Sequence, residues 1–230
     1  MSRLLVLSHP LRADAPVWPG NPAAAGIELV DSMARGDPDN AAALHLFAHS
    51  GTHVDTPWHF NAAGRAAWQL QIEAFVFAAP VLIEVPAGED AAIDPAALEP
   101  HAAAIADADL VMIRTGWSAL RSTEPERFAN RGPYLAPDAA RWLMDRHPRL
   151  RAIATDAISI GSPRHREVSH ETHHVLTGVG RTDDRFVLIY EDVGLVAEAA
   201  AARRVLAWPL FVDGADGSPV TFVAELPDAN

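Results

Sequence analysis

One stretch limits what this chain can fold into: HSGTHVDTPWHF, which spans residues 49–60. Four polar side chains in it occupy odd positions, namely His49, His53, Asp55 and His59. On an extended backbone they would all point to one face, because successive residues of a strand alternate. A straight strand would nevertheless separate His49 from His53 by roughly 13 Å, which is too far for one bound ion to reach both. We therefore expect the backbone to curl at Gly51, a residue that adopts turn dihedrals without steric cost.

The residue types in this stretch suit a divalent metal. Neutral imidazole and carboxylate groups are ligands for Zn²⁺ and also for Mn²⁺ or Fe²⁺. His49, His53 and Asp55 are therefore three candidate ligands that leave coordination positions open, as a catalytic metal requires. The chain contains no cysteine, so histidine and carboxylate side chains must hold any metal. The simpler alternative, three unrelated polar residues in a surface loop, is disfavoured by their density beside a glycine hinge.

The chain as a whole has the composition of one globular domain, residues 1–230. Its apolar fraction is 49% and its charged fraction 21%, both ordinary for a protein with a buried core. The formal charge of -12 disfavours nucleic acid and anionic membranes as partners. The N-terminal apolar run is too short for a signal peptide, and no segment approaches the roughly eighteen apolar residues of a membrane span. We therefore expect a cytoplasmic protein.

Short apolar runs predict many strands and few helices. The expected strands cover residues 4–7, 27–30, 43–48, 81–85, 109–114, 151–158, 186–192, 205–211 and 220–224. One helix should begin with Asp94 as N-cap and Pro95 in the first turn, and continue to about residue 104. A second should run from Pro137 to about His147. This pattern predicts an α/β or α+β domain.

The run HSGTHVDTPWHF resembles the HxGTHxDxPxHF signature of the metal-dependent cyclase family, which includes bacterial arylformamidases (kynurenine formamidases) and isatin hydrolases. The resemblance implies that His49, His53 and Asp55 bind a divalent metal, Zn²⁺ or Mn²⁺, and that His59 is the acid/base residue. It also implies a swivelling β/β/α domain, in which a mixed sheet or barrel-like core carries a few helices, and assembly into a homodimer or homotetramer. The Pro-rich N-terminal segment, which has little reason to fold back on its own domain, also favours an oligomer.

Shorter resemblances to the same family lie elsewhere in the chain. The segment PVWPGNP around Trp18 is similar to one that contributes to the family's active-site wall. In ATDAIS, Asp156 matches an aspartate that supports the site. The segment PLFVDGADGSPV near the C-terminus is also similar, and its DGADGS part is typical of a loop between two strands.

Two further site residues come from the second half of the chain. In YEDVGL, Glu191 matches a metal ligand or acid/base partner of the family, and His173 matches a histidine that precedes this strand. The resemblance makes both of them candidate metal ligands. His174 is the adjacent alternative. Residues 178–185 lengthen the interval between these two positions in this chain. Whether the chain binds a second metal, and whether its substrate is formylkynurenine, therefore stay open.

The leading functional hypothesis is a metal-dependent hydrolase that cleaves an amide, formamide or lactam C–N bond with metal-activated water. His59 would move the proton, with Glu191 as the alternative. Trp18, Phe47 and Trp58 are candidate substrate-binding residues, and their rings predict a flat aromatic substrate. Two alternatives remain: a metal-dependent lyase or cyclase that acts through an enolate, and a non-catalytic protein that binds a small molecule through its metal.

Overall fold

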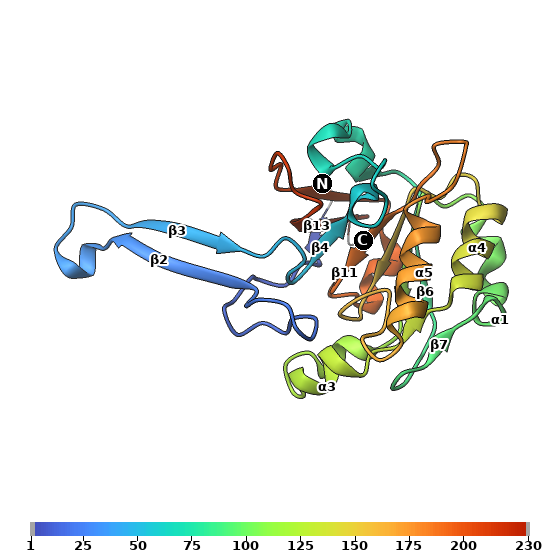
Figure 1. Cartoon of the computed structure of the whole chain (residues 1–230), viewed down its shortest axis with the longest axis horizontal. Helices are drawn as coiled ribbons and strands as arrows, with labels where there is room; N and C mark the ends of the chain where they lie inside the picture. The colour runs from blue at the N-terminus through green and yellow to red at the C-terminus, as the bar shows by residue number, and fades with distance from the viewer. Residues whose placement is uncertain (1–2, 229–230) are drawn as a thin grey trace.

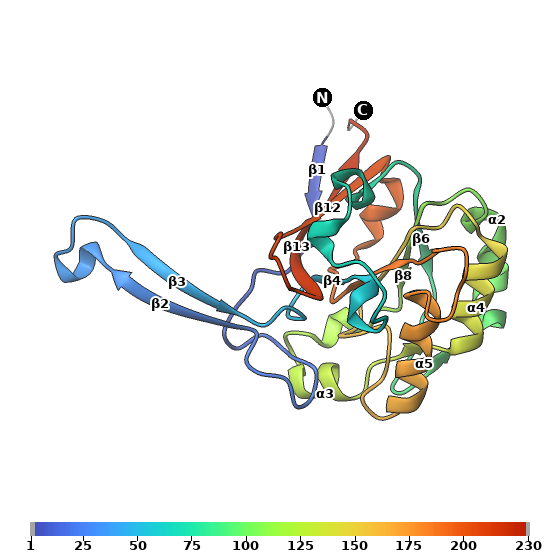
Figure 2. The ribbon, with the colours of Figure 1, turned by 45° about the horizontal axis from the view of Figure 1, so that its top comes forward.

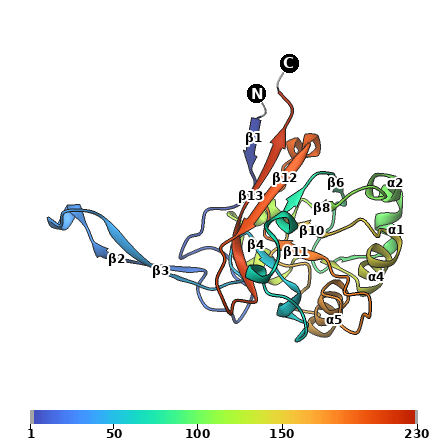
Figure 3. The ribbon, with the colours of Figure 1, turned by 90° about the horizontal axis from the view of Figure 1, so that it is seen from above.

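One mixed β-sheet runs through the described part of the chain, residues 3–228 of a computed structural model (Figure 1). One end of it consists of four parallel strands: β6 (Pro80–Glu84), β8 (Leu110–Arg114), β10 (Ala152–Thr155) and β11 (Leu188–Glu191). Antiparallel strands continue the sheet beyond β11: β4 (His53–Asp55), β13 (Gly217–Leu226), β12 (Arg204–Pro209) and β5 (Val76–Phe77). The C-terminal half of β13 also pairs with β1 (Arg3–Val6), so the first and the last strand of the chain lie side by side (Figure 3).

Alternate residues of the parallel strands face two different cores. In β8, Val111 and Ile113 belong to one core, and Leu110 and Met112 belong to the other. Helices cover the first core, on the right of Figure 1: α1 (Pro95–Leu98), α2 (Ala102–Ile105), α4 (Pro137–Arg146) and α5 (Arg166–Leu176). The curl of the sheet encloses the second, with buried aromatic rings of Phe75, Phe77, Tyr190 and Phe222. The predicted mixed, barrel-like sheet with few helices is thereby confirmed.

The first expected helix is interrupted. Asp94 caps it as predicted, because its carboxylate accepts a hydrogen bond from the backbone nitrogen of Ala97 at 3.0 Å. The α-helix nevertheless ends at Leu98, and a 3-10 turn over Glu99–His101 separates α1 from α2. Pro100 lies in this turn, and its ring excludes a helical hydrogen bond at that point. No helix within residues 3–228 is long and apolar enough to cross a membrane.

The strand predicted for residues 151–158 ends earlier, at Thr155, and Asp156 lies just beyond its end. Its side chain is buried and accepts hydrogen bonds from the backbone nitrogen and hydroxyl of Thr115 and from the backbone nitrogen of Gly116. The carboxylate therefore has the partners that burial requires. It ties the loop after β8 to the loop after β10, both at the edge of the sheet that carries the candidate site.

A two-stranded hairpin projects far from the body of the protein (Figures 1 and 2). It consists of β2 (Ala25–Asp31) and β3 (Ala41–Leu46), paired antiparallel. The expectation for the Pro-rich N-terminal segment is therefore corrected. That segment folds back on its own domain, where Pro16 and Trp18 reach the candidate site, and the hairpin that follows it forms the projecting arm. The remaining elements are the helix α3 (Pro125–Asn130) and the paired strands β7 (Ala92–Ile93) and β9 (Tyr134–Leu135).

Candidate active site

Two neighbouring antiparallel strands, β4 and β11, bring the first site residues together. Their register places His53 opposite Glu191, and Asp55 lies two residues along on the same face of β4. All three side chains are buried. The predicted curl at Gly51 is confirmed, since this residue has φ of 58°. His53 Nδ1 donates to the Gly51 carbonyl oxygen at 2.8 Å, which leaves Nε2 to face the carboxylates.

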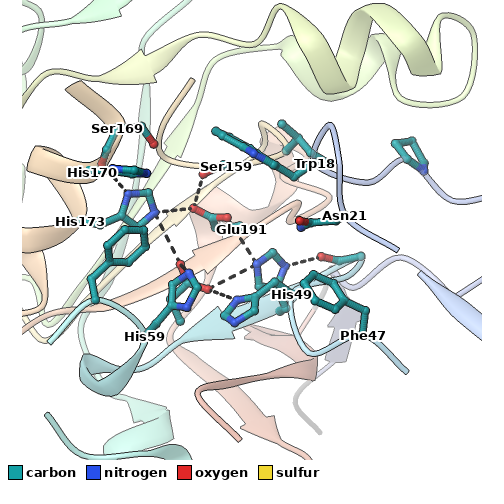
Figure 4. Close-up of a pocket in the computed structure, with 16 residues that line it drawn as sticks. Trp18, Asn21, Phe47, His49, His59, Ser159, Ser169, His170, His173 and Glu191 are labelled. Atoms are coloured by element: carbon teal, nitrogen blue, oxygen red, sulfur yellow. Dashed lines mark hydrogen bonds and ion pairs between the residues drawn. The ribbon is translucent and has the colours of Figure 1, made fainter. Parts of the chain in front are cut away.

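His173 reaches the same place from helix α5 (Figure 4). Its Nδ1 donates to the carbonyl oxygen of Ser169 at 2.7 Å, so its Nε2 also faces the carboxylates. The helix can approach this closely because residue 161 is glycine: a Cβ there would lie 1.8 Å from Ser169 Oγ. Of the histidines in this region, His165, His170 and His174 are exposed and only His173 is buried. His173 rather than His174 therefore faces the site.

The distances within this cluster match those between ligands of one metal ion. His53 Nε2 lies 3.5 Å from Asp55 Oδ1 and 3.3 Å from Glu191 Oε2. His173 Nε2 lies 3.6 Å from Asp55 Oδ2 and 3.5 Å from Glu191 Oε1. Two ligands of a tetrahedral ion with bonds of about 2.1 Å are separated by about 3.4 Å. Ligand atoms of His53, Asp55 and Glu191 therefore lie close enough to share one divalent ion. Each carboxylate presents one oxygen to His53 and the other to His173.

Hydrogen bonds hold Glu191 in this orientation. Its Oε1 accepts from the hydroxyl of Ser159 and from the backbone nitrogen of Ile160, both at 2.7 Å. Each bond comes from the loop that follows β10. The carboxylate is thus oriented from behind, and its remaining lone pairs face the two histidines.

His49 and His59 form a second group beside the first. His49 Nδ1 lies 2.7 Å from Asp55 Oδ1, a hydrogen-bond distance that is shorter than a ligand–ligand separation. His59 Nε2 lies 3.9 Å from Asp55 Oδ2. Ligand atoms of His49, Asp55 and His59 lie close enough for them to share an ion. All five predicted metal ligands and His59 therefore meet around Asp55.

Sequence reasoning missed one member of this group, Asp216. Its Oδ2 lies 2.7 Å from His59 Nδ1 and 3.0 Å from His49 Nε2. It comes from the loop between β12 and β13, whose glycines and acids also predict an ordinary turn. The similarity of PLFVDGADGSPV to the cyclase family is the one signal that could have directed attention to it.

Opposite charges dominate the electrostatics of the site. Burial lowers the pKa of His49, but Asp55 and Asp216 outweigh it and raise the pKa to about 9. Burial and the charge of Asp55 raise the pKa of Glu191, but hydrogen bonds from His173 and His53 hold it at about 2. In the metal-free protein, protons on histidines thus balance the buried carboxylates. A divalent cation can replace these protons, since the ligand forms of histidine and carboxylate are the deprotonated ones.

A cavity of ≈ 200 Å³ opens above the cluster. Trp18 and Phe47, both predicted as substrate-binding residues, line it (Figure 4). Phe60 lines it as well. The expectation for Trp58 is corrected. Trp58 lies in the 3-10 turn Pro57–His59, is 40% exposed, and borders a separate hollow with Trp68 instead of this cavity.

Fold and donor set together define an α/β metalloenzyme with a buried histidine–carboxylate centre. The cyclase family model matches residues 5–162, and the chain belongs to that family. It is 30% identical to a kynurenine formamidase from Maricaulis maris over 241 residues, which cover 99% of this chain and 100% of the relative. A kynurenine formamidase from Erythrobacter litoralis is 29% identical, with 99% and 96% covered. Isatin hydrolase A from Labrenzia aggregata, bound to benzyl benzoate, has the same fold, with a TM-score of 0.82, 22% identity, and 99% and 94% covered.

The raised pKa of His49 predicts how metal and pH act on stability. A group whose pKa is raised from 6.5 to about 9 by folding stabilises the metal-free protein fully below pH 6.5, and this stabilisation is lost as pH rises through 9. Bound metal takes over the role of the proton, so the difference in Tm between metal-loaded and chelated protein should widen from pH 6.5 to pH 9. Thermal unfolding of both forms across this range measures it. A difference that stays constant or narrows would contradict the predicted exchange of protons for metal.

Proposed function

We propose that this protein is a metal-dependent hydrolase that uses water to cleave the C–N bond of an amide, formamide or lactam. One observation carries the proposal: His53, Asp55 and Glu191, all buried, have ligand atoms close enough to share an ion at the base of an aromatic cavity. His173, also buried, lines the same cavity, and His59 lies beside the group. The relationship to kynurenine formamidases supports the C–N bond as the target. The cluster provides what such hydrolysis needs, a Lewis-acid site next to a group that moves protons.

The donor set would hold Zn²⁺ or Mn²⁺, with His49 as a further ligand. When bound, the metal polarises the scissile carbonyl and lowers the pKa of a coordinated water. Glu191 would act as a ligand through Oε2, because Ser159 and Ile160 already donate to Oε1. His53 and His173 present Nε2 to the metal, each held by a bond from Nδ1 to a backbone carbonyl.

His59 is the acid/base residue of this proposal. Pro57 starts the turn that carries it, so the path from Asp55 to His59 is stiff. Asp216 occupies its Nδ1, and its Nε2 points toward the Asp55 side of the cluster. An imidazole placed there can accept a proton from the attacking water and return it to the leaving nitrogen.

The substrate we propose carries a flat aromatic ring. Trp18, Phe47 and Phe60 provide aromatic faces along the cavity, and such walls favour planar apolar groups. Trp18 packs in turn against the cluster of Trp117 and Phe128, which supports it from behind. The cavity volume suits one small ring system and leaves no room for a polymer.

The lyase or cyclase alternative uses the same residues, with the metal stabilising an enolate while His59 moves a proton. A pure binding protein is the weaker alternative, because ligand sequestration requires no positioned acid/base group. Products decide between them: hydrolysis yields an amine and a carboxylate or formate, elimination yields an unsaturated product, and a binding protein yields none.

Metal removal tests the proposed function directly. Wild-type protein is assayed with aryl formamides, isatin-like lactams and simple esters before and after chelation, with metal content measured in each sample. We expect C–N hydrolysis that disappears with the metal and returns on addition of Zn²⁺ or Mn²⁺. Full turnover by protein shown to contain no metal would refute the proposal.

Removal of the His59 imidazole tests its role. In His59→Ala we expect kcat to fall by about 10²- to 10⁴-fold, while metal content stays normal and KM changes only a few-fold. The matched control is His165→Ala, since His165 is an exposed histidine of the same region that does not line the cavity. A His59→Ala protein that purifies without metal would make His59 a ligand and Glu191 the candidate base.

We propose the cytoplasm as the location of the protein. We also propose that the protein is a homodimer in which a second copy covers the β2–β3 arm. Ile27 pairs with Leu44 and Leu29 with Ala42 on one face of the arm. Ile27 and Leu44 are each 62% exposed in the single chain. A two-stranded hairpin with an uncovered apolar face is marginal in water. An apolar partner surface would supply the missing cover, and a homotetramer would result if two such dimers associate.

Light scattering at micromolar concentration checks the dimer. The double variant Ile27→Lys, Leu44→Glu should shift the mass to that of a monomer, because it places charges where the apolar cover would lie. Glu28→Gln, His45→Gln changes the opposite face of the same arm and should leave the dimer intact. A wild-type protein of monomeric mass would exclude the proposed assembly.

A further inference from the structure

The loop between β12 and β13 places one carboxylate between two histidines of the site. Asp216 Oδ2 lies within hydrogen-bond distance of both His59 Nδ1 and His49 Nε2, at 2.7 and 3.0 Å. The two imidazole rings stack with centroids 3.9 Å apart and an interplanar angle of 28°. This stacking brings two basic groups together, and the shared carboxylate makes the arrangement favourable.

The carboxylate is not needed to hold its own loop. The carbonyl oxygen of Asp216 accepts two bonds from Thr56, from the hydroxyl at 2.8 Å and from the backbone nitrogen at 3.4 Å. Directly after it, β13 pairs with β4, with Gly217 opposite Asp55. The backbone is therefore fixed on both sides, and the side chain is available for another role.

The loop is also shaped around the histidines. A Cβ on residue 217 would lie 2.4 Å from His49 Cε1 and 2.8 Å from the carbonyl oxygen of Val54. Only glycine allows His49 to lie against the backbone at this point. The close approach brings Asp216 Oδ2 within hydrogen-bond distance of both rings.

The hydrogen bond to His59 determines which ring nitrogen carries the proton. An ionised carboxylate can only accept, so His59 Nδ1 must donate. In the neutral ring the other nitrogen, Nε2, then carries the lone pair. This is the nitrogen on the side of Asp55 and the metal donor set. Without the carboxylate, the neutral ring is free to adopt the other tautomer and to rotate about its side-chain bonds.

We propose that Asp216 is a positioning residue for His59, which holds the Nδ1–H and so presents the basic Nε2 to the reacting water. The inference rests on the proposed hydrolase function and adds to it a residue that acts through His59. Asp216 also contacts His49, a proposed metal ligand, so the metal content of Asp216→Asn separates an effect through His59 from one through metal binding.

Kinetics in two backgrounds test the proposal. Asp216→Asn should lower kcat by about 10- to 100-fold, with normal metal content and KM within a few-fold. In the His59→Ala background the same substitution should cause little further loss, because its effect depends on the imidazole. Asp213→Asn, an exposed acid of the same loop, is the matched control and should behave as wild type. Wild-type kcat in Asp216→Asn, or an equal loss in both backgrounds, would overturn the positioning role.

Nitrogen NMR gives a readout that does not depend on turnover. Protein with ¹⁵N-labelled histidine, loaded with diamagnetic Zn²⁺, should show the His59 proton on Nδ1, with the signal assigned by its absence in His59→Ala. In Asp216→Asn the Nε2-protonated tautomer should appear. If the wild-type protein hydrolyses none of the substrates but shows this change, the proposed function fails and the positioning contact stands. If it hydrolyses them and the tautomer is unchanged by the substitution, the positioning role fails alone.

Discussion

Burial of two carboxylates, Asp55 and Glu191, is the constraint on which the rest of the structure depends. Both are almost fully removed from solvent, and an unbalanced charge in that position would cost several kcal/mol. Histidines on three sides provide the balance, as cations in the metal-free protein and as metal ligands otherwise. The neighbouring strands, the helix that carries His173 and the loop that carries Asp216 are all placed so that these contacts form.

An ion pair between Asp192 and Arg121 lies next to the buried carboxylates and stabilises the strand ends that carry them. Asp192 follows Glu191 directly, adopts φ of 50°, and accepts two hydrogen bonds at 2.7 Å from Arg121. Its carbonyl oxygen accepts from the hydroxyl of Thr52, the residue before His53. The ends of β11 and β4 are thus tied together just outside the metal donors. This rigidity fits a site whose ligands must keep their separations within tenths of an ångström.

The segments that connect the projecting arm to the body of the protein also line the cavity. Asn21 lines the cavity just before β2 begins, and Phe47 and His49 line it just after β3 ends. If a second subunit covers the arm, it would therefore restrict the motion of the cavity wall in both connecting segments, the one before β2 and the one after β3. In the proposed dimer, subunit contacts and substrate contacts would therefore be mechanically linked, although they would lie on different parts of the molecule.

Sequence alone predicted the candidate metal motif, the curl at Gly51 and the division into many strands and few helices, because these follow from local rules: residue type, period and turn chemistry. Similarity to a family added His173 and Glu191 as candidates, and the fold brings both to the same place as the motif. Tertiary structure decided the rest. The position of Trp58 outside the cavity depends on a 3-10 turn, and the choice of His173 over His174 depends on which face of α5 packs inward. Asp216 joins the site because β13 pairs with β4, although Asp216 and His59 are 157 residues apart in the sequence. Contacts between such distant segments leave no local pattern, so only the folded chain shows them.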